Sequence, residues 1–176
     1  MTDDSFTYNG IDMYEQFNIR IVKYDLLMPE LRPRKVSIPL RSGAYDYGAN
    51  YHEERPLRLS VAVDGELSVD RFDNLKYILS RKGRIIMWDL QDRYFYGQLY
   101  DPVEVIDYFQ HCRREFEIVF ICEPYAYALE PTTLTSDQRT MPINYEGTRE
   151  TPTLITIRNL GTTAMQGITI TARVAN

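Results

Sequence analysis

The sequence contains little of the chemistry on which most enzymes depend. Its 176 residues include two histidines, two cysteines and one tryptophan. P-loop, G-x-G-x-x-G and C-x-x-C motifs are absent, and Ser42-Gly43 is not part of a G-x-S-x-G sequence after a strand. The spacing of His52 and His111 suggests no nucleophile–base–acid set. We therefore expect no enzyme activity, no catalytic residue and no cofactor.

The two cysteines, Cys112 and Cys122, are expected to be free thiols. If residues 103–112 and 115–122 form a hairpin, one cysteine lies at the turn and the other roughly 23 Å away at the far end. A disulfide needs Cα atoms within about 7 Å of each other. The same separation argues against a zinc site made from His111 and the two cysteines, and a fourth ligand is missing. We expect no metal site.

Long apolar runs and an excess of positive charge are also missing. No run of 18 apolar residues is present, so no membrane span is expected. The net charge of −5 disfavours a dedicated nucleic-acid binder. The opening MTDDSFTYNG lacks the basic start and apolar stretch of a signal peptide, so we expect synthesis and folding in a cytoplasm.

Alternation of apolar and polar residues is the main signal that the sequence does contain. Strands are predicted at 5–10, 17–24, 35–39, 57–63, 84–90, 93–100 and 103–109. In FEIVFICEPYAYALEP, Phe116, Ile118, Phe120 and Cys122 alternate with other residues until Pro124, where we expect the strand to end in a bend. Strands at intervals of about ten residues are typical of an all-β sandwich or barrel.

One segment, SVDRFDNLKYILSRKG, has a helical period instead. We predict a helix over about 69–82, with Ser68 or Asp70 as the N-cap and Gly83 just beyond the C-terminus. The apolar positions at helical spacing are Phe72, Leu75, Ile78 and Leu79. This face is expected to pack on the core of a mainly β domain.

Two regions show no sustained period. The stretch between Pro39 and Pro56 holds three tyrosines and two glycines, and we predict a long loop or a loop with a short ragged strand. After Pro131 the chain is rich in threonine, with strands predicted at 154–158 and 168–174 and a weaker one at 141–145. The expected organisation is therefore a domain over 1–130, then a linker and partial β domain over 131–176.

Some forty residues with three strands cannot easily bury a core alone. We expect the second region to pack on the first domain, to exchange with a neighbouring subunit, or to be the start of a larger domain. Its last residues, Arg173 to Asn176, still follow the residue pattern of a strand, which favours a truncated domain.

Two functional alternatives rest on residues that follow the helix. Trp88, Tyr94 and Tyr96 could stack on sugar rings, as in a carbohydrate-binding module. Asp89 and Asp92 bracket a turn beside Trp88 and could form a polysaccharide hydrolase site. Glu104 and Asp107 are a further carboxylate pair. Asp-rich turns and core tryptophans are more common explanations of these residues.

Several segments, in order, resemble the distal tail protein family (Dit) of long-tailed phages. They are FTYNGIDMYEQFNI, SIPLRSGAYDYG, YHEERPLRLSVAV, WDLQDRYFYGQLYDPVEV and FEIVFICEPYAYALEP. The likeness to the family's N-terminal domain spans roughly residues 5–130, and residues 144–157 resemble the start of its C-terminal sandwich. Leu40 stands where the family often has Gly.

The resemblance implies a β-sandwich with one helix that assembles into a hexameric ring. Such a ring would join the tail tube to the baseplate or tail tip of a non-contractile tail, and DNA would only pass through its channel. The partners implied are further copies of the chain, the tail tube protein and tail-tip proteins, and the place implied is the virion tail, assembled in the host cytoplasm. We expect Arg41, Tyr45, Tyr47 and Tyr51 to line subunit or tube contacts, because tyrosine supplies rigid, amphipathic contact area.

Overall fold

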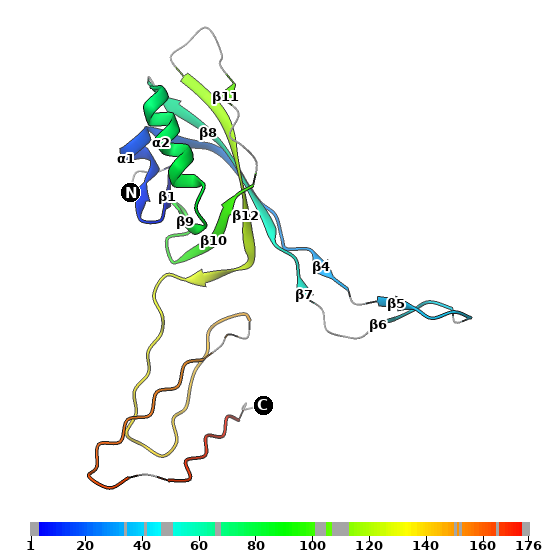
Figure 1. Ribbon diagram of the computed structural model, residues 1–176, viewed down its shortest axis with the longest axis vertical. Coiled ribbons are helices and arrows are strands. Elements are labelled where there is room, and N and C mark those ends of the chain that lie inside the picture. Colours follow the sequence, from blue (N-terminus) through cyan, green and yellow to red (C-terminus); the bar gives the residue numbers. More distant parts are fainter. Residues whose placement is uncertain are drawn as a thin grey trace. The chain divides into compact units, whose positions relative to one another are not determined.

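The structure is a computed structural model. It describes residues 4–33, 35–40, 42–46, 51–65, 68–100, 105–106, 113–149, 151, 153–164 and 166–173. The chain divides into two compact units, Met1–Thr133 and Leu134–Asn176. All helices and strands assigned among these residues lie in the first unit (Figure 1).

The first unit is built on one eight-stranded antiparallel sheet, which confirms the predicted mainly β fold. Along the sheet the strands run β2-β1-β9-β10-β12-β8-β3, and β11 pairs with β12. Their bounds are Phe6–Tyr8 (β1), Ile11–Asp12 (β2), Ile19–Leu26 (β3), Arg55–Asp64 (β8), Gly83–Met87 (β9), Arg93–Leu99 (β10), Val105–Ile106 (β11) and Arg113–Ala128 (β12). The remaining predicted residues of 103–109 lie outside the described part of the chain.

The sheet buries one face, as the alternation in the sequence predicted. Every second residue of β12 from Phe116 to Cys122 is buried, and so is every second residue of β8 from Leu57 to Val63. The two strands pair along ten residues, from Arg113 opposite Asp64 to Cys122 opposite Arg55. Each of these larger apolar side chains contributes about 1.5–3 kcal/mol when it leaves water.

The two ends of the sheet approach each other without forming a closed barrel. The Ile21 amide of β3 donates to the Asp4 carbonyl over 2.6 Å, and the Ser5 hydroxyl donates to the Ile19 carbonyl over 3.1 Å. The Ser5 carbonyl accepts from the Trp88 amide, just beyond β9. Residues 4–5 therefore join β3 to β9. In the described residues, the predicted sandwich or barrel-like domain is thus one open, rolled sheet, and two separate two-stranded sheets accompany it.

Two helices accompany the sheet, where one was predicted. Helix α2 covers Val69–Leu79, as expected, and the Ser68 hydroxyl caps its start by accepting from the Arg71 amide. Leu75 and Leu79 enter the core formed by the buried face of the sheet. The helix ends with Ser80 as its C-cap, and Gly83 instead begins β9.

The helix that sequence reasoning missed is α1, Met13–Phe17. The Asp12 carboxylate accepts from the Tyr14 and Glu15 amides, and Asn18 ends the helix in the left-handed conformation with φ 56°. Five residues are too few to show a helical period, so only these capping residues could have revealed it.

Strand β12 continues past Pro124, contrary to the expectation that the strand ends there. Its pairing with β8 stops at Cys122, and its pairing with β10 is interrupted between Cys122, opposite Gly97, and Ala126, opposite Phe95. Pro124 thus lies inside this irregularity, where its missing N–H removes no ladder hydrogen bond. β12 then rejoins β10 and ends at Ala128.

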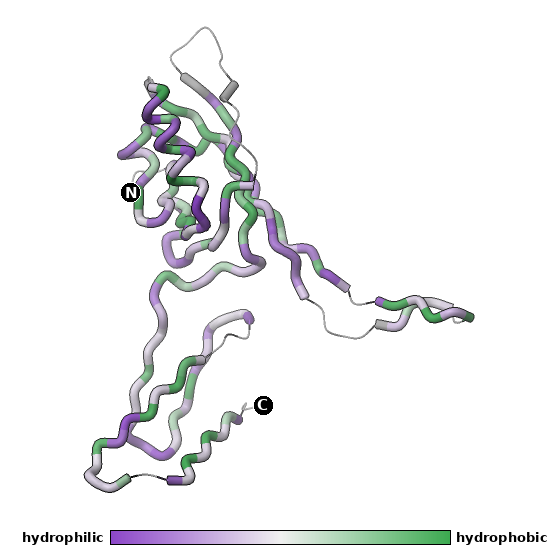
Figure 2. The backbone as a smooth tube through the Cα atoms, in the orientation of Figure 1, coloured by the Kyte–Doolittle hydropathy of each residue, from purple (hydrophilic) through white to green (hydrophobic). Residues whose placement is uncertain are grey.

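The second unit contains no assigned strand among its described residues. The predictions at 141–145, 154–158 and the described part of 168–174 are therefore wrong. Its apolar side chains, including Leu154, Leu160 and Ile168, stay exposed. Figure 2 shows hydrophobic and more polar positions interspersed along the backbone of this unit, which is the pattern that suggested strands. An extended segment becomes a stable strand only when a neighbouring strand accepts its hydrogen bonds and covers its apolar face.

Candidate functional site

The connection between β3 and β8 contains short paired strands, which agrees with the predicted alternative of a loop with a short strand between Pro39 and Pro56. We refer to residues 27–54 as the arm. It contains two short ladders, β4 (Leu31–Arg32) with β7 (Tyr51–His52), and β5 (Lys35–Ser37) with β6 (Ala44–Asp46). The strand prediction at 35–39 is confirmed by β5. Figure 1 shows the arm continuing from the β3 and β8 pair.

Registers relate the base of the arm to the sheet. Leu26 stands opposite Leu57 at the end of β3, and five residues further on Leu31 stands opposite His52, so β4–β7 keeps the register of β3–β8. The β5–β6 ladder, with Lys35 opposite Asp46, is offset from that register by two residues. Prolines explain why the strands are short, because Pro29 precedes β4, Pro33 follows it, and each lacks the N–H that a ladder needs.

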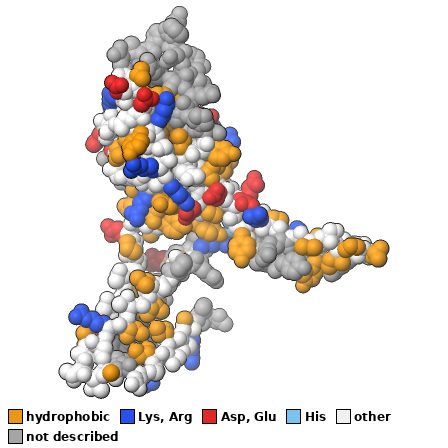
Figure 3. Space-filling model, in the orientation of Figure 1, with side chains coloured by type: hydrophobic (Ala, Val, Ile, Leu, Met, Phe, Trp, Pro, Cys, Tyr) orange, Lys and Arg blue, Asp and Glu red, His pale blue; other side chains and the backbone are white. Residues whose placement is uncertain are grey.

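The arm carries large apolar side chains that the chain itself leaves in contact with solvent. Figure 3 shows hydrophobic side chains along its length and at its tip. Those at least two-fifths exposed are Leu27, Met28, Leu31, Val36, Ile38, Leu40, Tyr45 and Tyr51. A two-stranded hairpin has only marginal stability in water by itself. Exposed apolar surface of this extent is typical of a protein–protein contact.

Two of the four predicted interface residues can be located on the arm. Tyr45 lies in β6 and is 46% exposed, and Tyr51 lies in β7 and is 61% exposed. Arg41 and Tyr47 lie outside the described residues. Both described tyrosines are therefore exposed on the arm, and their role in contacts stays a prediction.

Leu40 has a backbone conformation that glycine would adopt more easily. Its φ is 66°, in the left-handed region, and its side chain is fully exposed in the turn that joins β5 to β6. A leucine in this conformation costs roughly 1–2 kcal/mol relative to the ordinary backbone regions. The family that the sequence resembles often has Gly here, so the turn keeps a glycine-like backbone while carrying a large apolar side chain.

Polar contacts hold the base of the arm. The Glu53 amide donates to the Glu30 carbonyl over 2.8 Å, and the Glu53 carboxylate pairs with Arg32 at 3.2 Å. The ring of His52 meets that of Tyr125 in β12 edge-on at 5.6 Å, and its Nδ1 shares a 2.8 Å hydrogen bond with the Tyr125 hydroxyl. The Glu53 contacts thus join the two sides of the arm, and the His52–Tyr125 contact ties the arm to the sheet.

The aromatic residues of the carbohydrate hypothesis do not form one open platform. Trp88 is half-buried against the core. Tyr94 stacks on Tyr127 at 5.5 Å, with the Arg84 guanidinium also over its ring at 4.8 Å. The Lys82 ammonium lies 4.8 Å from the centre of the Tyr96 ring. Protein groups thus contact the rings that a sugar would need.

The two carboxylates of the hydrolase hypothesis have separate protein partners. Asp89 accepts a hydrogen bond from the Tyr24 hydroxyl. Asp92 forms a two-point ion pair with Arg93 at 2.6 and 2.9 Å, and this pairing lowers the pKa of the Asp92 carboxyl. A general acid needs a raised carboxyl pKa, so the pairing with Arg93 does not suit Asp92 for that role. Glu104 and Asp107 lie outside the described residues.

Cys122 is a buried thiol at the centre of the sheet. Burial raises its pKa to about 12, and the nearby Arg55 guanidinium only partly opposes that effect. A thiol with so high a pKa is a poor nucleophile at neutral pH. Cys112 and His111 lie outside the described residues.

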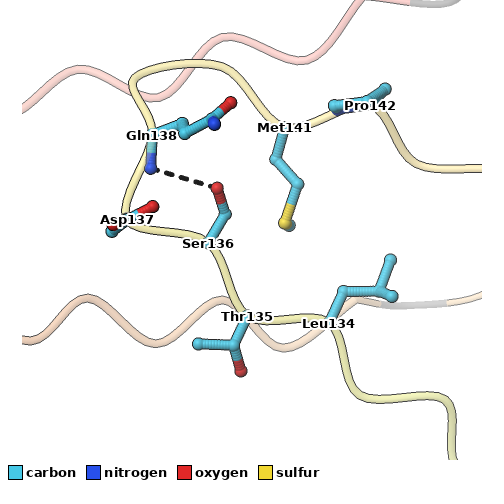
Figure 4. Close-up of a pocket in the computed structure, with 7 residues that line it drawn as sticks. All are labelled: Leu134, Thr135, Ser136, Asp137, Gln138, Met141 and Pro142. Atoms are coloured by element: carbon cyan, nitrogen blue, oxygen red, sulfur yellow. Dashed lines mark hydrogen bonds between the residues drawn. The ribbon is translucent and has the colours of Figure 1, made fainter.

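Other kinds of site find little support in the part of the chain that the structure describes. A concavity of about 580 Å³ is bounded by the single exposed loop 134–142, and its one hydrogen bond joins the Gln138 amide to the Ser136 hydroxyl (Figure 4). The described residues contain no cluster of three His, Cys, Asp or Glu side chains suited to a metal ion. Among them, neither helix has the length and apolar character needed to span a membrane.

Comparison with known proteins gives a match at the level of structure. No protein-family model matches the chain, and no curated protein matches it. The chain resembles the crystal structure of the SPP1 Dit protein, described as a paradigm of the hub adsorption apparatus in phages that infect Gram-positive hosts. The TM-score is 0.56 at 20% identity, over 70% of this chain and 51% of that one. Over the matched part, the chain has the fold of a Dit protein.

This likeness confirms, for the fold, the resemblance to distal tail proteins seen in the sequence. The chain spans about half the length of the SPP1 Dit protein. A second solved structure, the tail of an empty GTA particle with C6 symmetry, matches with a TM-score of 0.38 and 8% identity, over 65% of this chain and 84% of that one.

Proposed function

We propose that the chain is a structural protein of a phage tail that assembles into a hexameric adaptor ring. The ring joins the tail tube to the baseplate or tail tip of a long non-contractile tail. Its partners are further copies of itself, the tail tube protein and the tail-tip proteins. It is assembled in the host cytoplasm and remains in the virion tail, and DNA passes through its channel.

The observation that carries the proposal is the arm. A Dit-like fold supports a place in a tail, and a hairpin with large exposed apolar side chains supports assembly through that hairpin. Removing such surface from water stabilises an interface by about 25 cal/mol for each Å² buried, before the costs of association. The arm is thus suited to contact a neighbouring copy.

Charge is compatible with this function. With a net charge of −5, the chain has no bulk attraction for the DNA that would move through the ring. A protein that acts by symmetric assembly also needs no catalytic groups. The domain organisation that we propose is a ring domain over 1–130, followed by a linker and the first part of a C-terminal β domain over 131–176.

Matched tyrosine substitutions test the proposal. The double variant Tyr45→Ala/Tyr51→Ala shortens two exposed aromatic side chains of the arm, whereas Tyr77→Ala/Tyr100→Ala shortens two that are 59% and 67% exposed outside it. In sedimentation velocity, the parent protein and the second variant should give a species near six times 20.7 kDa. The arm variant should shift toward single chains. Equal effects of the two variants would contradict a specific role of the arm.

A further inference from the structure

The arm joins the sheet through a short segment that has little backbone pairing. The β3–β8 ladder ends at Leu26 opposite Leu57, and the next ladder begins at Leu31 opposite His52. In the same register Pro29 stands opposite Glu54, and Pro56 opposite Leu27. Because prolines lack the N–H, each removes a possible ladder hydrogen bond. Residues 27–30 and 53–54, which are linked by the backbone hydrogen bond from Glu53 to Glu30, therefore form a hinge at the base of the arm.

A side-chain pair crosses from the arm side of this hinge to β12. The β8–β12 ladder ends with Arg55 opposite Cys122. Three residues further along each strand, the same register places His52 opposite Tyr125. The backbone ladder cannot continue unbroken between them, since Pro124 lies on this stretch of β12. The 2.8 Å hydrogen bond and the edge-on ring contact of His52 with Tyr125 extend the pairing through side chains instead.

Tyr125 also lies in the last part of β12, residues 123–128, which we call the outgoing segment. Beyond Tyr125, Ala126, Tyr127 and Ala128 pair with β10, after which the chain continues toward residue 134. The Glu123 carboxylate accepts from Lys82 at 2.8 Å and from the Tyr127 hydroxyl at 2.6 Å. Residues 123–128 are thus held by β10 and Lys82 on one side, and by the arm on the other.

We propose that the His52–Tyr125 pair couples the orientation of the arm to the conformation of the outgoing segment, residues 123–128. While the pair is formed, the hinge is bridged and both segments keep one arrangement. When the pair opens, the arm can turn about residues 27–30 and 53–54, and the outgoing segment loses its contact with the arm through His52. The coupling lies within one chain and does not depend on formation of a ring.

Hydrogen exchange on the full chain, diluted until sedimentation shows a single species, tests the coupling. Tyr125→Phe removes the hydroxyl and keeps the ring. We expect exchange to rise by a factor of about 3 to 10 both at the Glu53 amide and in residues 123–128, as for loss of one hydrogen bond. His52→Phe should reproduce both changes. The double variant should exceed neither single variant by more than a factor of about 2.

Tyr127→Phe is the matched control, because it removes a hydroxyl two residues away whose partner, Glu123, is on the same strand. Its effect should be confined to residues 123–128. The proposal is overturned if Tyr125→Phe leaves the Glu53 amide unchanged. It is also overturned if Tyr127→Phe accelerates exchange at Glu53 as strongly as Tyr125→Phe does.

Discussion

The Tyr24 hydroxyl donates a hydrogen bond to the Asp89 carboxylate and so links β3 to the turn that follows β9. These residues lie near opposite ends of the strand order, so the bond joins two parts of the sheet that share no ladder. Together with the backbone contacts of Asp4 and Ser5, it holds the sheet in its rolled form. It also gives the Asp89 side chain a structural role.

Replacing Tyr24 by Phe should therefore weaken the fold. We expect the free energy of unfolding in urea to fall by about 1 kcal/mol, since the bond involves a charged acceptor but lies in partly exposed surroundings. Tyr100→Phe, which alters an exposed tyrosine elsewhere, should leave it unchanged within about 0.5 kcal/mol. An unaltered free energy for the Tyr24 variant would show that the sheet does not need this link.

Alkaline pH should destabilise the protein over a defined window. Burial raises the pKa of Tyr8 to about 12, and hydrogen bonds to Asp89 and Glu123 raise those of Tyr24 and Tyr127 to about 12. The folded state thus holds these protons more tightly than the unfolded state, whose tyrosines titrate near 10. Their contribution is complete below pH ~10 and is lost as the pH rises toward ~12.

The measurement for this window is the urea midpoint at a series of pH values, and buried Cys122 should extend the decline down to pH ~9. Tyr24→Phe should flatten part of the decline, because one of the titrating groups is removed. A midpoint that stayed constant or rose between pH ~10 and ~12 would contradict the assigned environments.

Gly97 is required by the close approach of β10 and β12. A Cβ atom at this position would lie 2.7 Å from the Cys122 Sγ and 2.8 Å from the Ile121 carbonyl oxygen. We expect Gly97→Ala to lower the free energy of unfolding by about 1–3 kcal/mol, as in other overpacked cores. Adding Cys122→Ala should recover only part of the loss, because the carbonyl contact remains. Full recovery would mean that the sulfur alone requires glycine.

Much of the first unit could be predicted because its signals are local. The alternation from Phe116 to Cys122 and the helical period of α2 each follow from residues close in sequence. The path of β12 through Pro124 could not be predicted in this way, since it depends on an irregular pairing with β10. In the second unit, alternation of apolar and polar residues predicted strands that the structure does not contain in its described part. Leu154 and Ile168 alternate with polar residues there but lie in no ladder.

The candidate site was only partly predictable for the same reason. Tyrosine content marked Tyr45 and Tyr51 as contact residues, and both are exposed on the arm. The hairpin itself was missed because prolines divide it into strands of two or three residues, too short for a period of two to be recognised. What reveals the arm is the register shared by distant residues such as Leu26 and Leu57, and then Leu31 and His52.

The substitution Leu40→Gly should affect folding stability and subunit assembly differently. Glycine suits the positive φ of this residue, so the thermal unfolding midpoint should be unchanged or slightly higher. The substitution also removes a fully exposed apolar side chain from the tip of the arm, and assembly in sedimentation should weaken about 3- to 30-fold. Unchanged assembly would exclude the tip from the subunit contact.

The most direct test of ring formation is electron microscopy of the purified full chain over a range of concentrations. The account predicts closed rings of six subunits with a central channel, whose number falls in the Tyr45→Ala/Tyr51→Ala variant. Single particles of one chain at every concentration, including the highest attainable, would contradict it.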